Sequence, residues 1–461
     1  MSSFRIIRAS MALAMILWCG ITFAARSHQP RVHRSLRHSI NSRSDSHVEP
    51  FLVTVVTPQA GSKSTLTDTN PHNMSAYLVG EAPDPKNPGQ FFDFLAQHSK
   101  DGSTNYFTPP DNTRQGLVRA APATVSWKVG PAGTGFKTPG AVKGGRIYLV
   151  ADGHLDFYTD QDKKIIHPDP HNAMDVASRE LWGFIEFTHM KDPSSGDESM
   201  IVNLSFVDWV SLPLGIGITS KSKNGTNNVT LGGLEPDGLA RVCEALSALG
   251  SFWPRLCMRS PNKTPIRVMS PEKYISLHSD DKDATNYYEP YINTVWEKYK
   301  NVDLQINTQV DGPNSVNKVD NGRIITCRVG SEDNLLHCDN DAGDFARPVS
   351  RDIYGCNSGP FANPASGTES WSRSRVRPRL CAAFARSTLH LDGVQPSYSV
   401  GPDKYYQHPI TNHYSKVVHE NLIGGSGYAF SYDDVAPDST SNSAGLITTE
   451  HPIRLDIHIN I

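Results

Sequence analysis

Short runs of alternating apolar and polar residues dominate the chain from Pro50 to about Ile218. Gly, Pro, Asn and Asp divide the runs, a pattern typical of β-strands joined by turns. The runs are FLVTVVT, SAYLVG, TVSWKV, GRIYLVA, HLDFYT, WGFIEFT and VNLSFVDWV. Strands this short and closely spaced predict a β-sandwich or barrel.

The period changes from that of a strand to that of a helix near residue 234. Leu239, Val242, Leu246 and Leu249 recur at helical spacing before Gly250, which predicts a helix that stops there. More helices are expected in EPYINTVWEKYK and near 378–388 and 410–420, and strands in DLQINT, GRIITCRV and the terminal PIRLDIHINI. The pattern therefore predicts a mainly β protein. Residues 50–230 with the strands of 425–461 form a β domain, and residues 231–424 form a mixed α/β lobe across an open groove.

The N-terminus has the layout of a secretory signal peptide, expected over residues 1–25. Arg5 and Arg8 precede an apolar run that ends at Ala24 and Ala25, and a buried helix is the less favoured alternative. Residues 26–49 are rich in Arg, His and Ser, so we expect a disordered basic linker or pro-segment. The protein is thus expected to be secreted, extracellular or associated with a cell wall. Glycosylation sequons fit this location at Asn73, Asn224, Asn228 and Asn262.

The amino-acid composition indicates which classes of binding partner are not expected. The 461 residues carry 44 basic and 47 acidic side chains, a balance with no general attraction for nucleic acid. No apolar run after the signal reaches the roughly 20 residues that span a bilayer, so no membrane partner is expected. We expect a monomer that needs no cofactor.

The cysteines predict disulfide bonds. One of the seven lies in the predicted signal, which leaves an even number in a secreted chain. Sequence proximity favours three pairs: Cys243–Cys257, Cys327–Cys338 and Cys356–Cys381.

Two carboxylates interrupt apolar runs. In LWGFIEFTHM, strand alternation places Glu186 on one face with Trp182, Phe184 and Thr188, and the opposite face is apolar. In NLSFVDWVSLPLGIGI, Asp208 would share a face with Leu204 and Phe206, unless a bulge redirects it. An unpaired buried carboxylate is costly, so each needs a partner or borders a cleft.

Such a pair fits glycosidic bond hydrolysis. One acid delivers a proton to the leaving oxygen while the other stays ionised, and aromatic side chains offer platforms for sugar rings. The alternative is that each acid pairs with an Arg or an amide as a structural carboxylate. For one acid alone the structural role is favoured, and for the two together the balance is even.

Several blocks resemble glycoside hydrolase family 64, the thaumatin-related β-1,3-glucanases. From the N-terminus onward these are SAYLVG, WGFIEFT, NLSFVDWVSLPLGI, LCAAFARSTLH, KYYQHPITNHYSKVVHEN and GYAFSYDDVAP. The blocks follow one another in the order expected for the family, and the resemblance extends from about residue 50 to residue 461. The resemblance implies a thaumatin-like β-sandwich or barrel. It also implies inverting hydrolysis of β-1,3-glucan to short oligomers such as laminaripentaose.

The resemblance implies residue roles as well. Glu186 would be the general acid and Asp208 the general base, with Thr188, Asn203 and Ser205 binding sugar hydroxyls. Two departures affect the expected subsites. The polar loop 191–199 is longer than expected, and Ile201 stands where an aromatic residue is typical.

Other candidate sites carry weaker signals. His167, Asp169, His171 and Asp175 could suggest a metal cluster, but the prolines and absent helical period favour a loop, and no metal is expected. For Asp433 and Asp434, groove lining and turn capping remain open alternatives. A solvated or structural role is favoured over pairing with an acid for Arg146.

Two further hypotheses compete with hydrolysis. A thaumatin-like protein could bind glucan, or act in defence, without cutting the polymer. A structural wall protein would neither bind nor cut. Release of reducing sugar from a β-1,3-glucan separates them.

Overall fold

The computed structural model describes residues 48–57, 73–84, 86–87, 89–98, 104–107, 117–130, 132–160, 162–191, 196–223, 225–309, 318–319, 322–364, 369–438 and 443–461. The predicted signal peptide and residues 26–47 of the predicted linker lie outside these ranges. So do Asn224 and residues 192–195 of the polar loop.

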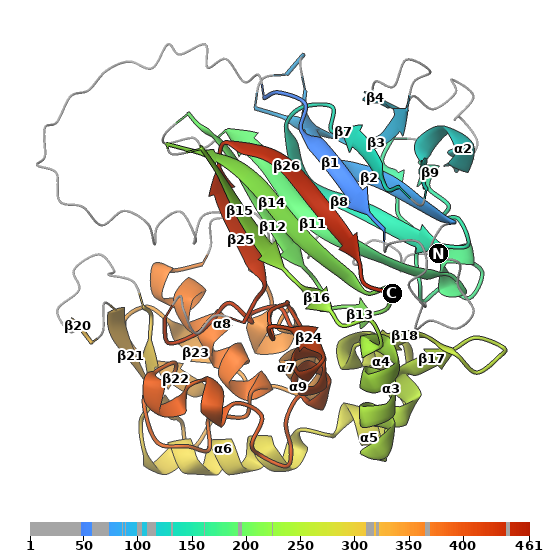
Figure 1. Cartoon of the computed structure of the whole chain (residues 1–461). Helices are drawn as coiled ribbons and strands as arrows, with labels where there is room; N and C mark the ends of the chain where they lie inside the picture. Colours follow the sequence, from blue (N-terminus) through green and yellow to red (C-terminus); the bar gives the residue numbers. More distant parts are fainter. Residues whose placement is uncertain are drawn as a thin grey trace, which may run out of the picture.

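Two β-sheets face each other in the upper half of the molecule (Figure 1). The larger sheet contains, in order, β25 (Leu446–Glu450), β12 (Glu198–Leu204), β11 (Leu181–Lys191), β8 (Val142–Ala151), β2 (Met74–Pro83), β3 (Phe91–His98) and β4 (Thr104–Tyr106), with β6 (Trp127–Val129) beside β2. The smaller sheet contains β15 (Gly225–Leu231), β14 (Leu214–Ser222), β26 (Pro452–Ile459), β1 (Leu52–Val56) and β7 (Thr134–Lys137).

Strand alternation builds the core between the sheets. Ile185 and Phe187 of β11 belong to the same buried apolar cluster as Ile216 of β14 and Ile457 of β26. Trp182 and Phe184, at the intervening positions, belong to a second cluster on the other side of the larger sheet. The two faces of β11 are therefore arranged as its sequence predicts.

The C-terminal strand lies inside the smaller sheet. β26 pairs in parallel with β1 and antiparallel with β14. The preceding strand, β25, pairs with β12 at the edge of the larger sheet. The last residues of the chain thus contribute one strand to each sheet.

The mixed lobe lies below the two sheets (Figure 1). The chain enters it at β16 (Gly233–Leu234) and leaves it at β24 (Leu422–Ile423), and these two strands pair with each other. Its helices are α3 (Gly238–Ala248), α4 (Pro271–Leu277), α5 (Lys282–Thr285), α6 (Glu289–Asn301), α7 (Ser350–Gly355), α8 (Trp371–Ala385) and α9 (His413–Glu420). Its further strands are β17 (Cys257–Arg259), β18 (Pro265–Met269), β19 (Leu304–Asn307), β20 (Lys318–Val319), β21 (Gly322–Val329), β22 (Leu336–Cys338) and β23 (Gly343–Phe345).

The helices show where sequence periodicity succeeds and where it fails. α3 buries Leu239, Val242 and Leu246 as predicted, whereas Leu249 follows the helix end and is exposed. The helix predicted near 378–388 is present as α8, but it begins earlier, at Trp371, and runs through Pro378. The Ser370 side chain caps it by accepting a hydrogen bond from the Arg373 backbone N–H at 3.1 Å.

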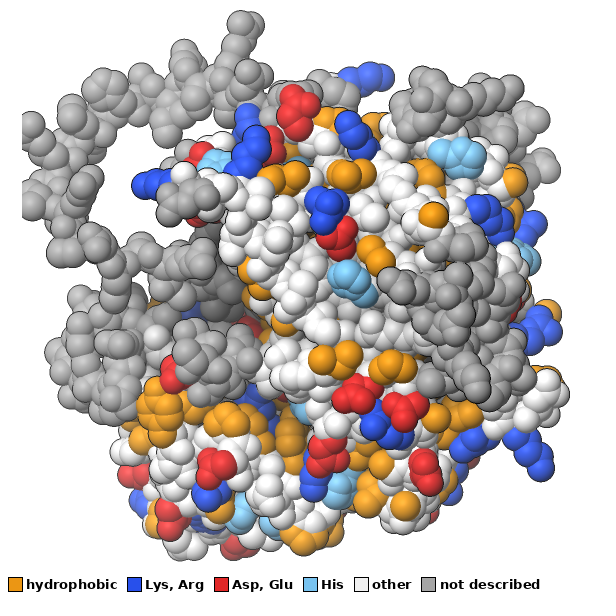
Figure 2. Space-filling view, in the orientation of Figure 1, with side chains coloured by type: hydrophobic (Ala, Val, Ile, Leu, Met, Phe, Trp, Pro, Cys, Tyr) orange, Lys and Arg blue, Asp and Glu red, His pale blue; other side chains and the backbone are white. Residues whose placement is uncertain are grey.

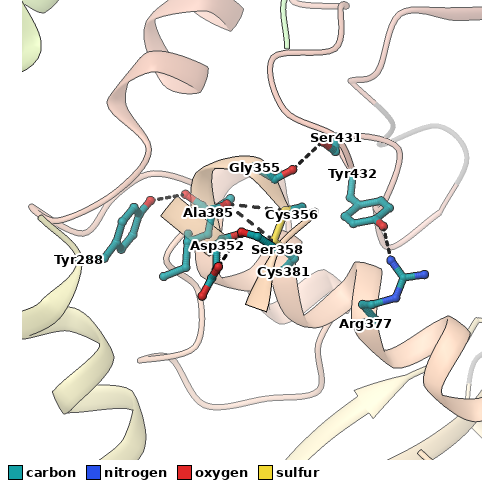
Figure 3. The surroundings of a disulfide bond; sticks show 11 residues. Tyr288, Asp352, Gly355, Cys356, Ser358, Arg377, Cys381, Ala385, Ser431 and Tyr432 are labelled. Carbon is teal, nitrogen blue, oxygen red and sulfur yellow. Dashed lines mark hydrogen bonds between the residues drawn. A yellow bond between two sulfur atoms is a disulfide. The ribbon is translucent and has the colours of Figure 1, made fainter. Parts of the chain in front are cut away.

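Three disulfides join the cysteine pairs that lie nearest in the sequence: Cys243–Cys257, Cys327–Cys338 and Cys356–Cys381. The third bond connects the end of α7 to the middle of α8 (Figure 3). Around it, the Ser431 hydroxyl donates to the Gly355 carbonyl at 3.0 Å, so the bond lies where several lobe segments meet.

Charges of both signs are interspersed on the face shown in Figure 2, without a continuous field of one sign. This agrees with the nearly balanced composition. Within the described part of the chain, none of the helices has the length and apolar character needed to cross a bilayer.

Candidate active site

Glu186 lies at the centre of a polar row on the outer face of the larger sheet. Its direct neighbours are Arg146 on β8 and Asn203 on β12. Side chains directly opposite each other on adjacent antiparallel strands point to the same face, with Cβ atoms about 5 Å apart. The strand register therefore brings one cation, one acid and one amide together.

Arg146 is the partner that offsets the cost of burying Glu186. Its Nε and Nη2 both donate to Oε1 of Glu186, at 3.0 and 2.8 Å. The guanidinium also lies 4.8 Å from the centre of the Phe184 ring. Burial alone lowers the pKa of Arg146, but Tyr148 and Glu186 outweigh it and raise that pKa above its usual value. Arg146 therefore stays charged beside the acid.

The polar row lies at the edge of an apolar surface that other segments of the chain cover. Farther along the same face, Tyr148, Trp182 and Phe184 pack with Leu155 and Phe157 from the segments that follow β8. Glu186 lies beyond this cluster, and its side chain keeps 11% of its surface exposed. The carboxylate thus has apolar packing on one side and access to solvent on the other.

Two of the three predicted sugar-binding residues, Thr188 and Asn203, lie on the same face of the larger sheet as Glu186. Thr188 is two residues after Glu186, half-buried, and its Oγ1 accepts a hydrogen bond from the Gly144 backbone N–H at 3.1 Å. Asn203 faces Glu186 across the strands and is half-buried. Ser205 follows the end of β12 and forms a parallel bridge with Tyr428.

The prediction that Asp208 continues the strand of Leu204 and Phe206 was wrong. β12 ends at Leu204, and Asp208 lies in a bend before β13 (Trp209–Val210). Leu204 and Phe206 enter the core, whereas Asp208 remains half-buried beside the lobe. The Asp208 side chain therefore does not share a face with Leu204 and Phe206, because the strand ends between them rather than continuing through a bulge.

The lobe holds the bend that carries Asp208. Trp209 pairs with Met269 of β18, and the Ser270 N–H donates to the Asp208 carbonyl at 2.9 Å. The Tyr414 hydroxyl of α9 donates to the Phe206 carbonyl at 2.5 Å. Contacts on both sides of Asp208 therefore determine where its side chain points.

A lysine from the lobe pairs with the Asp208 carboxylate. Nζ of Lys273, on α4, lies 3.4 Å from Oδ1 of Asp208. Asp208, ahead of the opposing effect of burial, raises the pKa of Lys273. Both partners are largely shielded, with 27% of the lysine side chain and 14% of the aspartate side chain exposed.

The two acids have two neighbouring side chains in common. Both Glu186 and Asp208 interact electrostatically with Arg146 and with Tyr148. A small pocket near the end of β12 is lined by Phe184, Ser205 and Trp209 together with apolar core side chains, and neither acid is part of its lining. The arrangement thus offers two carboxylates, each with a cation, next to two aromatic rings and several hydroxyl groups.

Three of the remaining candidates, Asp433, Asp169 and Asp175, have structural partners. Oδ2 of the fully buried Asp433 accepts from the backbone N–H groups of Ala429 and Phe430 and lies 3.1 Å from Nε2 of His419, so it caps a turn. The HPDPHNAMD segment is a loop in which Asp169 and Asp175 accept backbone hydrogen bonds. Across the described residues, no three His, Cys, Asp or Glu side chains are grouped to hold a metal ion.

Two basic residues matter more to the site than their sequence patterns indicate. Arg146 was expected to be solvated or structural but pairs with Glu186. Lys273 carries no motif that could reveal it. The sequence does contain one signal for Arg146. It is a basic residue within a predicted strand, and such a residue can pair across the sheet with an otherwise unexplained acid on the neighbouring strand.

Comparison with known proteins identifies the family. The family model described as beta-1,3-glucanase, glycoside hydrolase family 64, matches residues 65–459. The chain belongs to this family. The resemblance of its sequence blocks to family 64 is therefore confirmed.

Two relatives of this family 64 chain are named glucan endo-1,3-beta-glucosidase. They come from Cellulosimicrobium cellulans and from Arthrobacter sp. (strain YCWD3), and each is 26% identical over 294 residues. The match covers 63% of this chain but only 48% of each relative, so the chain aligns with about half the length of those proteins.

Solved structures share the fold. A laminaripentaose-producing beta-1,3-glucanase in complex with laminaritetraose has a TM-score of 0.68 at 22% identity, covering 90% of this chain and 99% of that chain. A beta-1,3-glucanase domain from Clostridium beijerinckii has a TM-score of 0.62 at 16% identity, covering 89% and 99%. The prediction of a mainly β fold is confirmed.

Proposed function

We propose that this protein is a secreted endo-acting β-1,3-glucanase that cleaves its polymer with inversion. The observation that carries the proposal is the placement of Glu186 and Asp208 around a shared set of neighbours in a family 64 chain. The names of the relatives support β-1,3-glucan as the substrate. The proposal includes a thaumatin-like β domain and an open groove between that domain and the lobe, acting as a monomer without a cofactor.

Glu186 is assigned as the general acid. Arg146 donates two hydrogen bonds to Oε1, and Oε2 accepts none from the described residues. Oε2 is therefore the atom that can carry a proton and deliver it to the glycosidic oxygen. Arg146 then stabilises the carboxylate that remains after proton transfer.

Asp208 is assigned as the general base. Among the described residues, Lys273 forms the ion pair with its carboxylate, through Oδ1. Oδ2 is left to accept a proton from the water that attacks the anomeric carbon on the opposite face of the sugar. Inversion requires the two carboxyl groups to lie about 6.5–9.5 Å apart, which leaves room for that water.

The neighbouring side chains are assigned to sugar binding. Thr188, Asn203 and Ser205 present hydroxyl and amide groups on the side of the sheet that carries Glu186, and the half-buried ring of Trp209 lies against the buried Phe184. Short oligomers of the laminaripentaose type are the proposed products. The similarity in fold to a laminaripentaose-producing beta-1,3-glucanase supports this assignment.

Glu186→Gln tests the proposal directly. The amide has no proton of suitable acidity, so release of reducing sugar from laminarin or curdlan should fall by at least 1,000-fold, on the order of the loss of an essential catalytic group. Pull-down of curdlan should remain, because the amide keeps the size of the side chain. A wild-type protein that binds curdlan and releases nothing would instead identify a non-hydrolytic glucan-binding or defence protein.

Two measurements complete the assignment. Proton NMR of the first product should show the α-anomer, as inversion of a β-linkage requires, and a β-anomer first would exclude inversion. Chromatographic sizing of products from a linear β-1,3-glucan then gives their length. Products dominated by glucose would contradict the proposed release of short oligomers.

A further inference from the structure

Lys273 is placed against Asp208 by backbone contacts rather than by a flexible surface pairing. Trp209 and Val210 pair with Met269 and Val268, and the Ser270 N–H donates to the Asp208 carbonyl at 2.9 Å. The Ser270 side chain then caps α4 by accepting from the Lys273 N–H at 3.4 Å. One turn of helix therefore separates the strand pairing from the lysine.

The charge of Lys273 is available to Asp208. Nζ of Lys273 lies 3.4 Å from Oδ1 of Asp208 and 3.7 Å from Oε2 of Glu272, its other acidic neighbour. Glu272 also has a second cation, since Nε and Nη2 of Arg351 both lie 3.2 Å from its Oε1. Lys273 is thus the cation nearest to Asp208 among the described residues. Glu272, in contrast, is shared between Lys273 and Arg351.

Other charged and titratable side chains also surround Asp208. Those that interact with it electrostatically are Arg146 and Tyr148 of β8, His171 of the loop before β11, Tyr414 of α9 and Lys273 of α4. Burial, against the effect of Asp169, lowers the pKa of His171 to about 4, so this ring is neutral near neutral pH. Burial also raises the pKa of Tyr148 and of Tyr414, which keeps both phenols neutral. The persistent charges facing Asp208 are therefore Lys273 and Arg146, and Arg146 is engaged with Glu186.

We propose that Lys273 is a positioning residue for the reaction: it holds Oδ1 of Asp208, leaves Oδ2 toward the attacking water, and keeps a positive charge beside that carboxylate. This inference rests on the proposed role of Asp208 as the base. A positive charge beside a carboxylate favours its ionised form, and a base must be ionised before it can accept a proton. Removal of the Lys273 charge is therefore expected to change the pH dependence of kcat/KM, which a purely structural role would not do.

The test compares pH–rate profiles of Lys273→Met, Lys273→Arg and wild type on soluble laminarin. In Lys273→Met the acidic limb of kcat/KM should move to higher pH by about one unit, the size of shift that loss of one neighbouring charge produces. Activity should fall about tenfold or more at pH 4.5 and by much less at pH 7, mainly in kcat. Lys273→Arg should keep the limb of the wild type.

Controls separate this inference from a structural effect. Lys300→Met removes a lysine paired with Glu297 at 2.7 Å on α6, and its profile should match the wild type. Curdlan pull-down and melting temperature are measured for every variant, and Lys273→Gln replaces Lys273→Met if the latter does not fold. An equal loss of activity at every pH, or an unmoved limb, would overturn the positioning role.

Asp208→Asn separates failure of the inference from failure of the proposed function. If this variant loses activity while the limb of Lys273→Met is unmoved, Asp208 remains the base and only the role of Lys273 is wrong. If Asp208→Asn retains activity, the base is assigned wrongly and both proposals fail.

Discussion

Arg146 determines how the Glu186 carboxylate can be used. Two of its N–H groups converge on one carboxylate oxygen, which leaves the other oxygen for proton transfer. The same contact offsets the cost of placing an acid beside Trp182 and Phe184, since an unpaired charge there would be strongly destabilising. One side chain thus serves both the stability of the sheet and the chemistry proposed for it.

Removing Arg146 should therefore affect stability and activity together. In Arg146→Met, Glu186 loses its partner while it remains largely shielded, so the free energy of unfolding should fall by about 2–4 kcal/mol. Activity on laminarin should drop at least 100-fold. Urea denaturation followed by fluorescence and a reducing-sugar assay check the two effects.

Arg241 offers a matched control for this change. It pairs with Glu235 and Asp237 but is 43% exposed, and exposed pairs contribute about 0–1 kcal/mol. Arg241→Met should leave the urea midpoint and the activity close to wild type. Equal urea midpoints for Arg146→Met and wild type would show that the Arg146 pair carries no stability.

At the scale of elements, strand β26 joins the end of the chain to its beginning. It lies between β14 and β1, so its inward residues pack against both neighbours and against the larger sheet. Leu455, Ile457 and Ile459 are buried, whereas Ile453 on the same strand is exposed. The strand thus provides its own internal comparison between core and surface positions.

Truncating Ile457 should be far more costly than truncating Ile453. Ile457→Ala removes buried methyl groups and leaves a cavity, so the free energy of unfolding should fall by about 2–5 kcal/mol. Ile453→Ala, at a side chain that is 36% exposed, should cost no more than about 1 kcal/mol. Urea denaturation measures both, and similar losses would contradict a central place for this strand.

For the whole molecule, the two acids are held by different parts of the chain. Glu186 is held by Arg146 within the larger sheet, whereas Asp208 is held by β18, α4 and α9 of the lobe. Arg267 of β18 reinforces this connection, because its guanidinium donates to the Ala177 and Glu180 carbonyls at 3.1 and 3.0 Å in the segment leading to β11. The spacing of the acids therefore depends on how the lobe packs against the β domain.

Stability of the whole molecule should depend on pH through His171. Burial, aided by Arg267 and Lys273 and opposed by Asp169, lowers the pKa of its ring to about 4, against 6.5 for an unperturbed histidine. Between these values the unfolded state binds more protons than the folded state, so stability falls as pH drops from 6.5 toward 4. The full effect is on the order of 3 kcal/mol.

His171→Phe should flatten this part of the stability profile, because the ring is kept against Trp209 but no longer titrates. Urea midpoints at several pH values between 4 and 8 measure the difference from wild type. His337 is a control of opposite sign, since its hydrogen bonds to Asp344 and Asp333 raise its pKa. Its replacement by Phe should steepen the loss toward acid, and unchanged slopes for His171→Phe would refute the assignment.

Much of this architecture could be predicted from the sequence because it is local. Alternation along β11 determined which side chains enter the core and which share a face with Glu186. Helical spacing predicted α3, and the nearest cysteines in the sequence are the ones joined. Each of these features depends on residues within one element or on short separations along the chain.

The partners of the two acids could not be predicted in this way. Arg146 faces Glu186 only because β8 and β11 are neighbours in one particular register, and Lys273 reaches Asp208 only because β13 pairs with β18. Strand order and register are set by packing of the whole sheet and lobe, and no local pattern encodes them. The sequence alone determined which acids are unusual, and the tertiary structure decided which cations hold them and where they point.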